Sequence, residues 1–149
     1  MTKELLNTEV EVATEKSEEV ELGFVESITL VNNKGAKRVI KAPESVPGHV
    51  YREAIKLQYE EKKLNFKHDG KENYERDEEG KLIPVVFTFE TEEKILNLYE
   101  NLAVMYFNDQ FTLEELQNGL DARKYQGTLT QIFASALGNA IVPLENQAK

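Results

Sequence analysis

The hydrophobic pattern changes its period once along this chain, and that change limits the fold more than any other feature. Between residues 24 and 41 the apolar residues are largely β-branched and form two short runs, separated by an Asn/Gly-containing loop at residues 32–35. Asn and Gly tolerate the positive φ that tight turns need, so residues 25–41 predict a β-hairpin. Beyond Pro43 and Pro47 the apolar residues recur at helical spacing. Since a lone hairpin is marginal in water, it must pack on those helices.

Helices are predicted in the remainder of the chain, at residues 47–63, 92–107, 112–119 and 128–141. Residues 65–83 are polar, contain glycines and lack a helical period, so we interpret them as a long connection between the first two helices. The sequence therefore predicts an α+β fold that is mainly α, with an N-terminal β-hairpin packed on a bundle of about four helices.

Capping boxes are predicted at two helix starts. Thr112 is followed three residues later by Glu115, and Thr128 by Gln131. In such a box the hydroxyl accepts from the backbone N–H three residues on, and the longer side chain accepts from the cap N–H. We expect these boxes to begin the last two helices.

Three further residues predict where helices begin and end. Thr91 precedes two glutamates and is the predicted cap of the second long helix. Gly119 is predicted to follow the C-cap of the third helix, where Gly adopts a left-handed conformation without strain. Pro143 is predicted to stop the last helix, because proline cannot continue one.

The length of 149 residues fits one domain. Residues 1–21 carry seven Glu against two Lys with scattered single apolar residues, and we expect a solvated acidic arm. The globular domain is predicted to span residues 22–141, and residues 142–149 are predicted to be a C-terminal tail.

Composition excludes several classes of protein. The absence of cysteine removes disulfides, zinc–thiolate sites and thiol nucleophiles, and fits a reducing cytosol. The sequence contains neither a long apolar window nor an N-terminal apolar run, so we expect no membrane span and no secretion. The net charge of −9 repels the phosphate backbone, so nucleic-acid binding is not expected.

Motifs that could carry catalysis or bind metal are incomplete. His49 and His68 have no partner nearby in the sequence and are interpreted as surface residues. Residues 75–86 resemble the start of a calcium-binding EF-hand loop, but Val86 occupies the position of its bidentate Glu. Adjacent carboxylates such as Glu92 and Glu93 are common at helix starts. We expect no catalytic residue, no cofactor and no metal site.

The most informative pattern lies between Tyr106 and Arg123. An aromatic pair at 106–107 is followed by Asn-Asp-Gln-Phe-Thr at 108–112. Glu-Leu comes next at 115–116, and then Gly-Leu-Asp-Ala at 119–122. The pattern ends with Thr-Leu-Thr-Gln-Ile-Phe at 128–133. This pattern resembles the C-terminal helical region of the tail assembly chaperones of long-tailed (siphovirus-type) phages and prophages of Gram-positive bacteria. In that family it follows a hairpin and a helix, and here the resemblance covers residues 24–64 and 92–138.

The resemblance implies a viral protein that binds without turnover. A chaperone of this kind is expected to bind the tape measure protein, keep it soluble and help recruit subunits of the major tail (tube) protein. It would act in the host cytoplasm and be absent from the mature virion. A further copy of itself, in a homo-oligomer, is a candidate partner, whereas no nucleic acid or membrane is expected as one.

Candidate protein-binding residues are the apolar side chains at the helical corner and on the last predicted helix. These side chains could equally form the core of the domain. They are Phe107, Phe111, Leu116, Leu120, Leu129, Ile132, Phe133 and Leu137.

Two alternatives come from other functional classes. An acidic inhibitor could mimic nucleic acid, but a mimic needs its acids on a rigid face, whereas more than half of the net charge here lies in the arm. A small hydrolase is the second alternative, and no motif of the sequence supports it.

Overall fold

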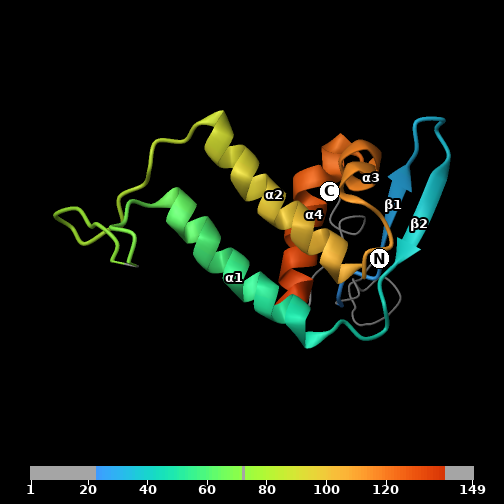
Figure 1. Ribbon diagram of the computed structural model, residues 1–149, viewed down its shortest axis with the longest axis horizontal. Coiled ribbons are helices and arrows are strands. Elements are labelled where there is room, and N and C mark those ends of the chain that lie inside the picture. The colour runs from blue at the N-terminus through green and yellow to red at the C-terminus, as the bar shows by residue number, and fades with distance from the viewer. Residues whose placement is uncertain (1–22, 72, 140–149) are drawn as a thin grey trace, which may run out of the picture.

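The computed structural model describes residues 23–71 and 73–139, so the predicted acidic arm at 1–21 and the tail at 142–149 lie outside the described residues. Its strands and helices follow the order predicted from the sequence (Figure 1). They are β1 (Ser27–Val31), β2 (Lys37–Lys41), α1 (Gly48–Asn65), α2 (Phe89–Tyr106), α3 (Leu113–Gly119), a 3₁₀ turn (Ala122–Lys124) and α4 (Tyr125–Ala136). The predicted α+β, mainly α fold is confirmed.

Strands β1 and β2 form an antiparallel pair in which Ile28 lies opposite Ile40. The turn between them is held by the Asn32 side chain, whose Oδ1 accepts the N–H groups of Lys34 and Ala36. Gly35 adopts φ +83°, which explains why glycine stands in this loop. Ile28, Leu30 and Ile40 point into the core, while alternate residues such as Val39 face outward.

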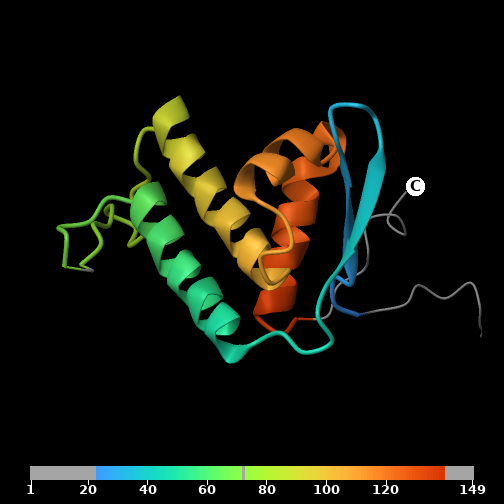
Figure 2. The ribbon, with the colours of Figure 1, turned by 45° about the vertical axis from the view of Figure 1, so that its right-hand side comes forward.

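Helices α1 and α2 pack against each other, and α4 packs against α2. Figure 2 shows the hairpin and α1 on opposite sides of the remaining helices. One core therefore joins the hairpin to all four helices, because its buried side chains come from each element. The core consists of Ile28, Leu30, Ile40, Val50, Ala54, Leu57, Leu102, Ala103, Tyr106, Phe107, Phe111, Leu116, Leu129, Ile132 and Ala136.

The predicted polar connection at 65–83 contains regular pairing that its composition did not indicate. Antiparallel bridges join Phe66 to Pro84, His68 to Tyr74 and Arg76 to Leu82. We call residues 65–85 the ribbon; residue 72 is not described. It projects beyond the end of the α1–α2 pair (Figures 1 and 2).

Aspartates hold the turns of the ribbon. Asp77 Oδ1 accepts the N–H groups of Glu79 and Lys81, as Asn32 does in the hairpin turn. Asp69 Oδ1 likewise accepts the N–H group of Lys71. Such side-chain bonds replace the apolar packing that the segment lacks.

Helix α2 begins three residues earlier than the predicted start at residue 92. Its cap is Thr88, whose hydroxyl accepts the N–H of Thr91 at 3.2 Å, so the prediction of Thr91 as cap was wrong. Glu90 and Glu92 occupy the first turn, where the positive end of the helix dipole stabilises acids.

The predicted bounds of the last helix, 128–141, were also wrong. The Asp121 side chain caps the 3₁₀ turn, which leads directly into α4. Thr128 therefore lies inside the helix and is not its cap. The helix ends before Leu137. Gly138 has φ +85° and donates its N–H to Ser135, and Asn139 donates to Ala134, which is a Schellman ending.

Helix α3 confirms one predicted feature and corrects another. Thr112 and Glu115 form the predicted capping box, with both reciprocal bonds present. Gly119, however, is the last residue of the helix and Leu120 is its C-cap. A Cβ on Gly119 would lie 3.0 Å from the carbonyl oxygen of Val31, which is closer than ordinary van der Waals contact, so glycine suits the close approach of α3 to β1.

Candidate functional site

The predicted protein-binding residues occupy two environments. Phe107, Phe111, Leu116, Leu129 and Ile132 are buried in the core, each at most 3% exposed. Leu120, Phe133 and Leu137 are partly buried and pack against that core. The corner is thus part of the packed interior in this structure, and its role in partner binding stays a prediction.

The corner between α2 and α3 is a sharp reversal of the backbone. Asn108 and Asp109 adopt φ of 60° and 59°, a region that Asn and Asp enter more readily than most residues. The Phe107 and Phe111 rings on either side lie 5.7 Å apart between centroids. Gln110 Nε2 donates to the carbonyl oxygens of Lys41 and Phe107, which ties the reversal to the hairpin. This segment therefore determines how helix and hairpin join.

Exposed apolar side chains gather at the start of α2 instead. Phe89 is 80% exposed, Val86 84%, Phe87 49% and Leu96 38%. A groove opens beside three of them, between the end of α1, the first half of α2 and the start of α4. We call it the α1–α2–α4 groove. Its apolar lining includes Phe66, Val85, Phe87, Phe89, Ile95, Leu96 and Leu129.

Tyrosines among the groove-lining residues are fixed by carboxylates. The Tyr99 hydroxyl donates to Glu61 at 2.7 Å, joining α2 to α1. The Tyr125 hydroxyl donates to the buried Glu100 at 2.5 Å, joining α4 to α2. Burial, and then the adjacent carboxylate, raises the pKa of each hydroxyl, so both remain donors beyond the pH at which an ordinary tyrosine ionises. The groove is therefore preformed.

Charge at the groove has one sign. Glu61, Glu92 and Glu93 line it, whereas its lining includes no Lys or Arg. Among the residues that the structure describes, none of these carboxylates is joined to a cation, because the ion pairs there lie at Arg38–Glu115, Lys81–Glu79 and Arg123–Asp121. The groove combines an apolar lining with an acidic rim.

One groove-lining residue also has a buried polar atom without a partner among the described residues. Asn65, the last residue of α1, lines the groove, and its Oδ1 is buried without a hydrogen-bond donor. Its own carbonyl oxygen accepts the N–H of Val85 at the end of the ribbon. An amide oxygen can only accept hydrogen bonds, so a donor group would satisfy it.

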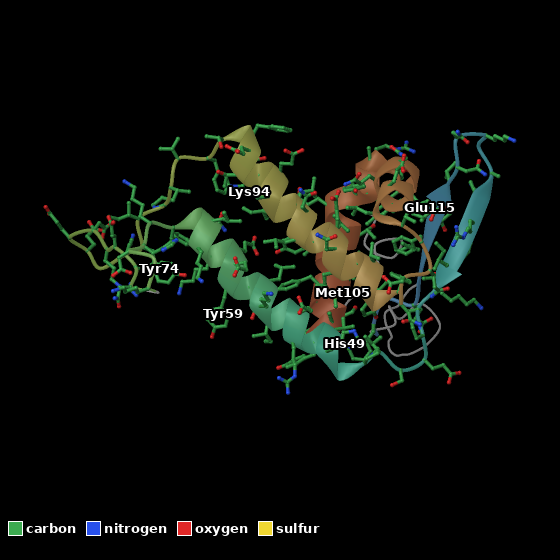
Figure 3. All side chains as sticks on the ribbon, viewed as in Figure 1. His49, Tyr59, Tyr74, Lys94, Met105 and Glu115 are labelled. Atoms are coloured by element: carbon green, nitrogen blue, oxygen red, sulfur yellow. The ribbon has the colours of Figure 1, made fainter. Side chains whose placement is uncertain are left out.

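His49 and His68 are the two histidines considered in the sequence for metal binding or catalysis. His68 Nδ1 accepts the N–H of Gly70, and its ring contacts Tyr74 edge to face at 5.7 Å. Figure 3 shows Tyr74 in the ribbon near the end of α1 and His49 at the opposite end of that helix. Over the described ranges, no group of three or more His, Cys, Asp or Glu is placed to hold a metal ion. The same ranges contain no helix that could cross a membrane.

A protein-family comparison decides what this architecture belongs to. The family model described as "Phage tail chaperone protein" matches residues 24–148. The chain belongs to the phage tail chaperone family. No curated protein and no solved structure matches it. This tail chaperone is therefore not an enzyme, and tail assembly takes the place of the inhibitor and hydrolase alternatives.

The tail chaperone acts in the host cell during tail assembly, and its partners are tail proteins. The groove that could receive one of them was not predicted. One local signal for it exists, since the apolar residues Val85–Phe87 precede α2 and Phe89 begins it, next to the acids of its first turn. The rest of its lining comes from α1 and α4, which the sequence alone does not bring together.

Proposed function

We propose that this tail chaperone binds the tape measure protein of a siphovirus-type phage or prophage of Gram-positive bacteria. It would keep the long helices of that protein soluble in the host cytoplasm and help recruit major tail (tube) protein subunits. It would then leave the assembly and be absent from the mature virion. The observation that supports this proposal is the solvent-open apolar groove beside Phe87 and Phe89.

The groove is suited to a helix with one apolar face. Isolated apolar side chains are common on protein surfaces, but a group of them beside a groove marks an interaction site. Fully burying an exposed phenylalanine side chain is favourable by about 1.5–3 kcal/mol, and the gain is smaller for Phe87, which is already half-buried. Phe87 and Phe89 together therefore supply a substantial part of the affinity for an amphipathic helix laid in the groove.

Recruitment of tube subunits is the second part of the proposal. A helix lying in the groove would leave the outward face of the hairpin free, since Val39 there is 60% exposed and does not line the groove. The chaperone could thus hold the tape measure protein with one surface while a tube subunit approaches another. The proposal assigns no residues to that second contact.

Co-expression with the tape measure protein tests the proposal. The wild-type chain should keep the tape measure protein soluble and co-purify with it. Phe87→Ser/Phe89→Ser should leave it in the insoluble fraction. The matched control is Tyr51→Ser/Tyr59→Ser, which removes exposed aromatic rings of α1 that are 50% and 58% exposed and outside the groove.

Two results would overturn parts of this proposal. An insoluble tape measure protein beside the folded wild-type chain would refute the function itself. Equal capture by the groove variant and the control would leave the function and refute the groove as its site. Circular dichroism of each variant checks that the helices are intact.

A further inference from the structure

We propose that the α1–α2–α4 groove selects a cationic amphipathic helix, with Lys or Arg flanking its apolar stripe, and that one of these cations binds beside Glu61 and Asn65. The inference rests on the proposed function, because it specifies which helices of the tape measure protein the groove accepts. It adds a charge requirement that the apolar lining does not impose.

The first argument is the sign of the groove's charges. Glu61 lies on the α1 wall, and Glu92 and Glu93 lie on the α2 wall. The nearby cation Lys62 is 4.6 Å from the centroid of the Tyr74 ring and does not line the groove. A helix with acidic flanks would meet like charges on both walls, whereas a basic one would pair with them.

The second argument is the arrangement of acceptors at the end of α1. Glu61 and Asn65 are four residues apart in one helix, so they lie on the same face. Among the residues that the structure describes, Asn65 Oδ1 is buried and has no donor, and the Glu61 carboxylate accepts from the Tyr99 hydroxyl. The negative end of the α1 dipole lies in the same turn. Each of these features favours a group that is both a cation and a donor.

The third argument concerns which occupant fits. A second copy of this chain carries a net charge of −9, so bringing it to an acidic rim costs electrostatic energy. An uncharged apolar helix would fill the lining but would supply neither a donor for the Asn65 oxygen nor a cation for the carboxylates. A cationic amphipathic helix satisfies both the apolar and the polar part of the groove.

Peptide binding tests this charge requirement directly. The probes are three synthetic amphipathic helices of about 18 residues, with one leucine stripe and with Arg, Gln or Glu at the flanking positions. Fluorescence anisotropy should give the Arg peptide an affinity at least about tenfold above the Gln peptide. The Glu peptide should bind most weakly, and the preference should shrink as salt screens the rim.

Variants of the chain distinguish the effect of the rim carboxylates on peptide binding from the effect of the net charge. Glu92→Lys/Glu93→Lys should reverse the preference between the Arg and Glu peptides. Glu53→Lys/Glu78→Lys makes the same change of net charge at exposed positions outside the groove, and it should retain the preference for Arg. Asn65→Ala should lower the affinity for the Arg peptide more than the affinity for the Gln peptide.

The outcomes distinguish this inference from the proposed function. Equal affinity for the three peptides, or an equal loss of preference in both double variants, would refute the charge requirement. Tape measure capture that persists in those circumstances would leave the proposed function intact. A wild-type dimer in light scattering that Glu92→Lys/Glu93→Lys dissociates would show a second copy in the groove, which contradicts the inference.

Discussion

Adding one methyl group at Gly119 should weaken the junction between α3 and the hairpin. The Cβ of an alanine at this position would lie 3.0 Å from the Val31 carbonyl oxygen and 3.1 Å from the Leu30 Cβ. It would also lie 3.2 Å from the Val31 N atom. Two of these three neighbours are backbone atoms, so relief requires movement of β1. Leu30 is only 5% exposed, and such movement would disturb the core.

The two contributions to this substitution have opposite signs. Alanine is favoured over glycine inside a helix by roughly 0.5–1 kcal/mol. Forcing an extra carbon into a well-packed site costs about 1–3 kcal/mol. Because the contact is with backbone, we expect the steric cost to win, giving Gly119→Ala a net loss of about 1–2 kcal/mol in unfolding free energy. Gly119→Val should lose more.

Urea unfolding followed by circular dichroism measures this effect. The matched control is Gly48→Ala at the start of α1, where a Cβ would meet no atom within 4 Å. Gly48→Ala should be neutral or slightly stabilising, with an unchanged m-value. If Gly119→Ala proved as stable as Gly48→Ala, the close approach of α3 to β1 would not be what requires glycine.

Three further predictions concern buried or partly buried side chains. Glu100→Ala should lower the unfolding free energy, measured in urea, by roughly 2–3 kcal/mol, because Tyr125 and Gln117 lose the acceptor of their hydrogen bonds. Glu100→Gln keeps an acceptor and should lower it less. Phe111→Asp should abolish the helical circular dichroism, since it places a charge at a site only 3% exposed; a folded variant that fails to capture the tape measure protein would instead make Phe111 a contact. The unfolding free energy should fall above pH 10, because burial raises the pKa of the Tyr125 hydroxyl in the folded chain, whereas in the unfolded chain this hydroxyl ionises near its ordinary value. In urea titrations at increasing pH, Tyr125→Phe should make that fall less steep.

Features fixed by local chemistry could be predicted from the sequence. The hairpin follows from its β-branched runs and the Asn32 turn, and the α3 start follows from the Thr112–Glu115 box. Each of these depends on bonds between residues that are close in the chain. The same kind of signal misled at Thr128, because Asp121 begins the helical segment earlier and the 3₁₀ turn carries it into α4.

Gly119 shows where local reasoning fails. Its place at the end of a predicted helix suggested a left-handed C′ residue, but the structure explains it by contact with β1, far away in the sequence. Gly138 has the conformation expected of C′, and it ends α4 before the proline that was predicted to do so. A glycine's role thus depends on its surroundings in space as much as on its position in the helix.

The groove could not be predicted for a similar reason. Its walls come from α1, α2 and α4, and only their packing leaves Phe87 and Phe89 exposed while Phe107 and Ile132 are buried. All four side chains look equally suited to a core in the sequence. Apolar character indicates that a residue will pack, whereas the partner it packs on is decided by the tertiary fold.

The corner at residues 107–111 lies outside the groove proposed to bind a partner, whereas other residues within the resemblance, such as Ala122 and Leu129, line that groove. The resemblance is strongest at the corner, where Asn108 and Asp109 reverse the chain and Phe107 and Phe111 are buried. Substitutions there should lower unfolding stability and capture together. Substitutions at exposed Phe89 should lower capture while stability remains unchanged, because that ring contributes little to the core. Measuring unfolding stability and capture on the same variants distinguishes residues that stabilise the fold from residues that contact the partner.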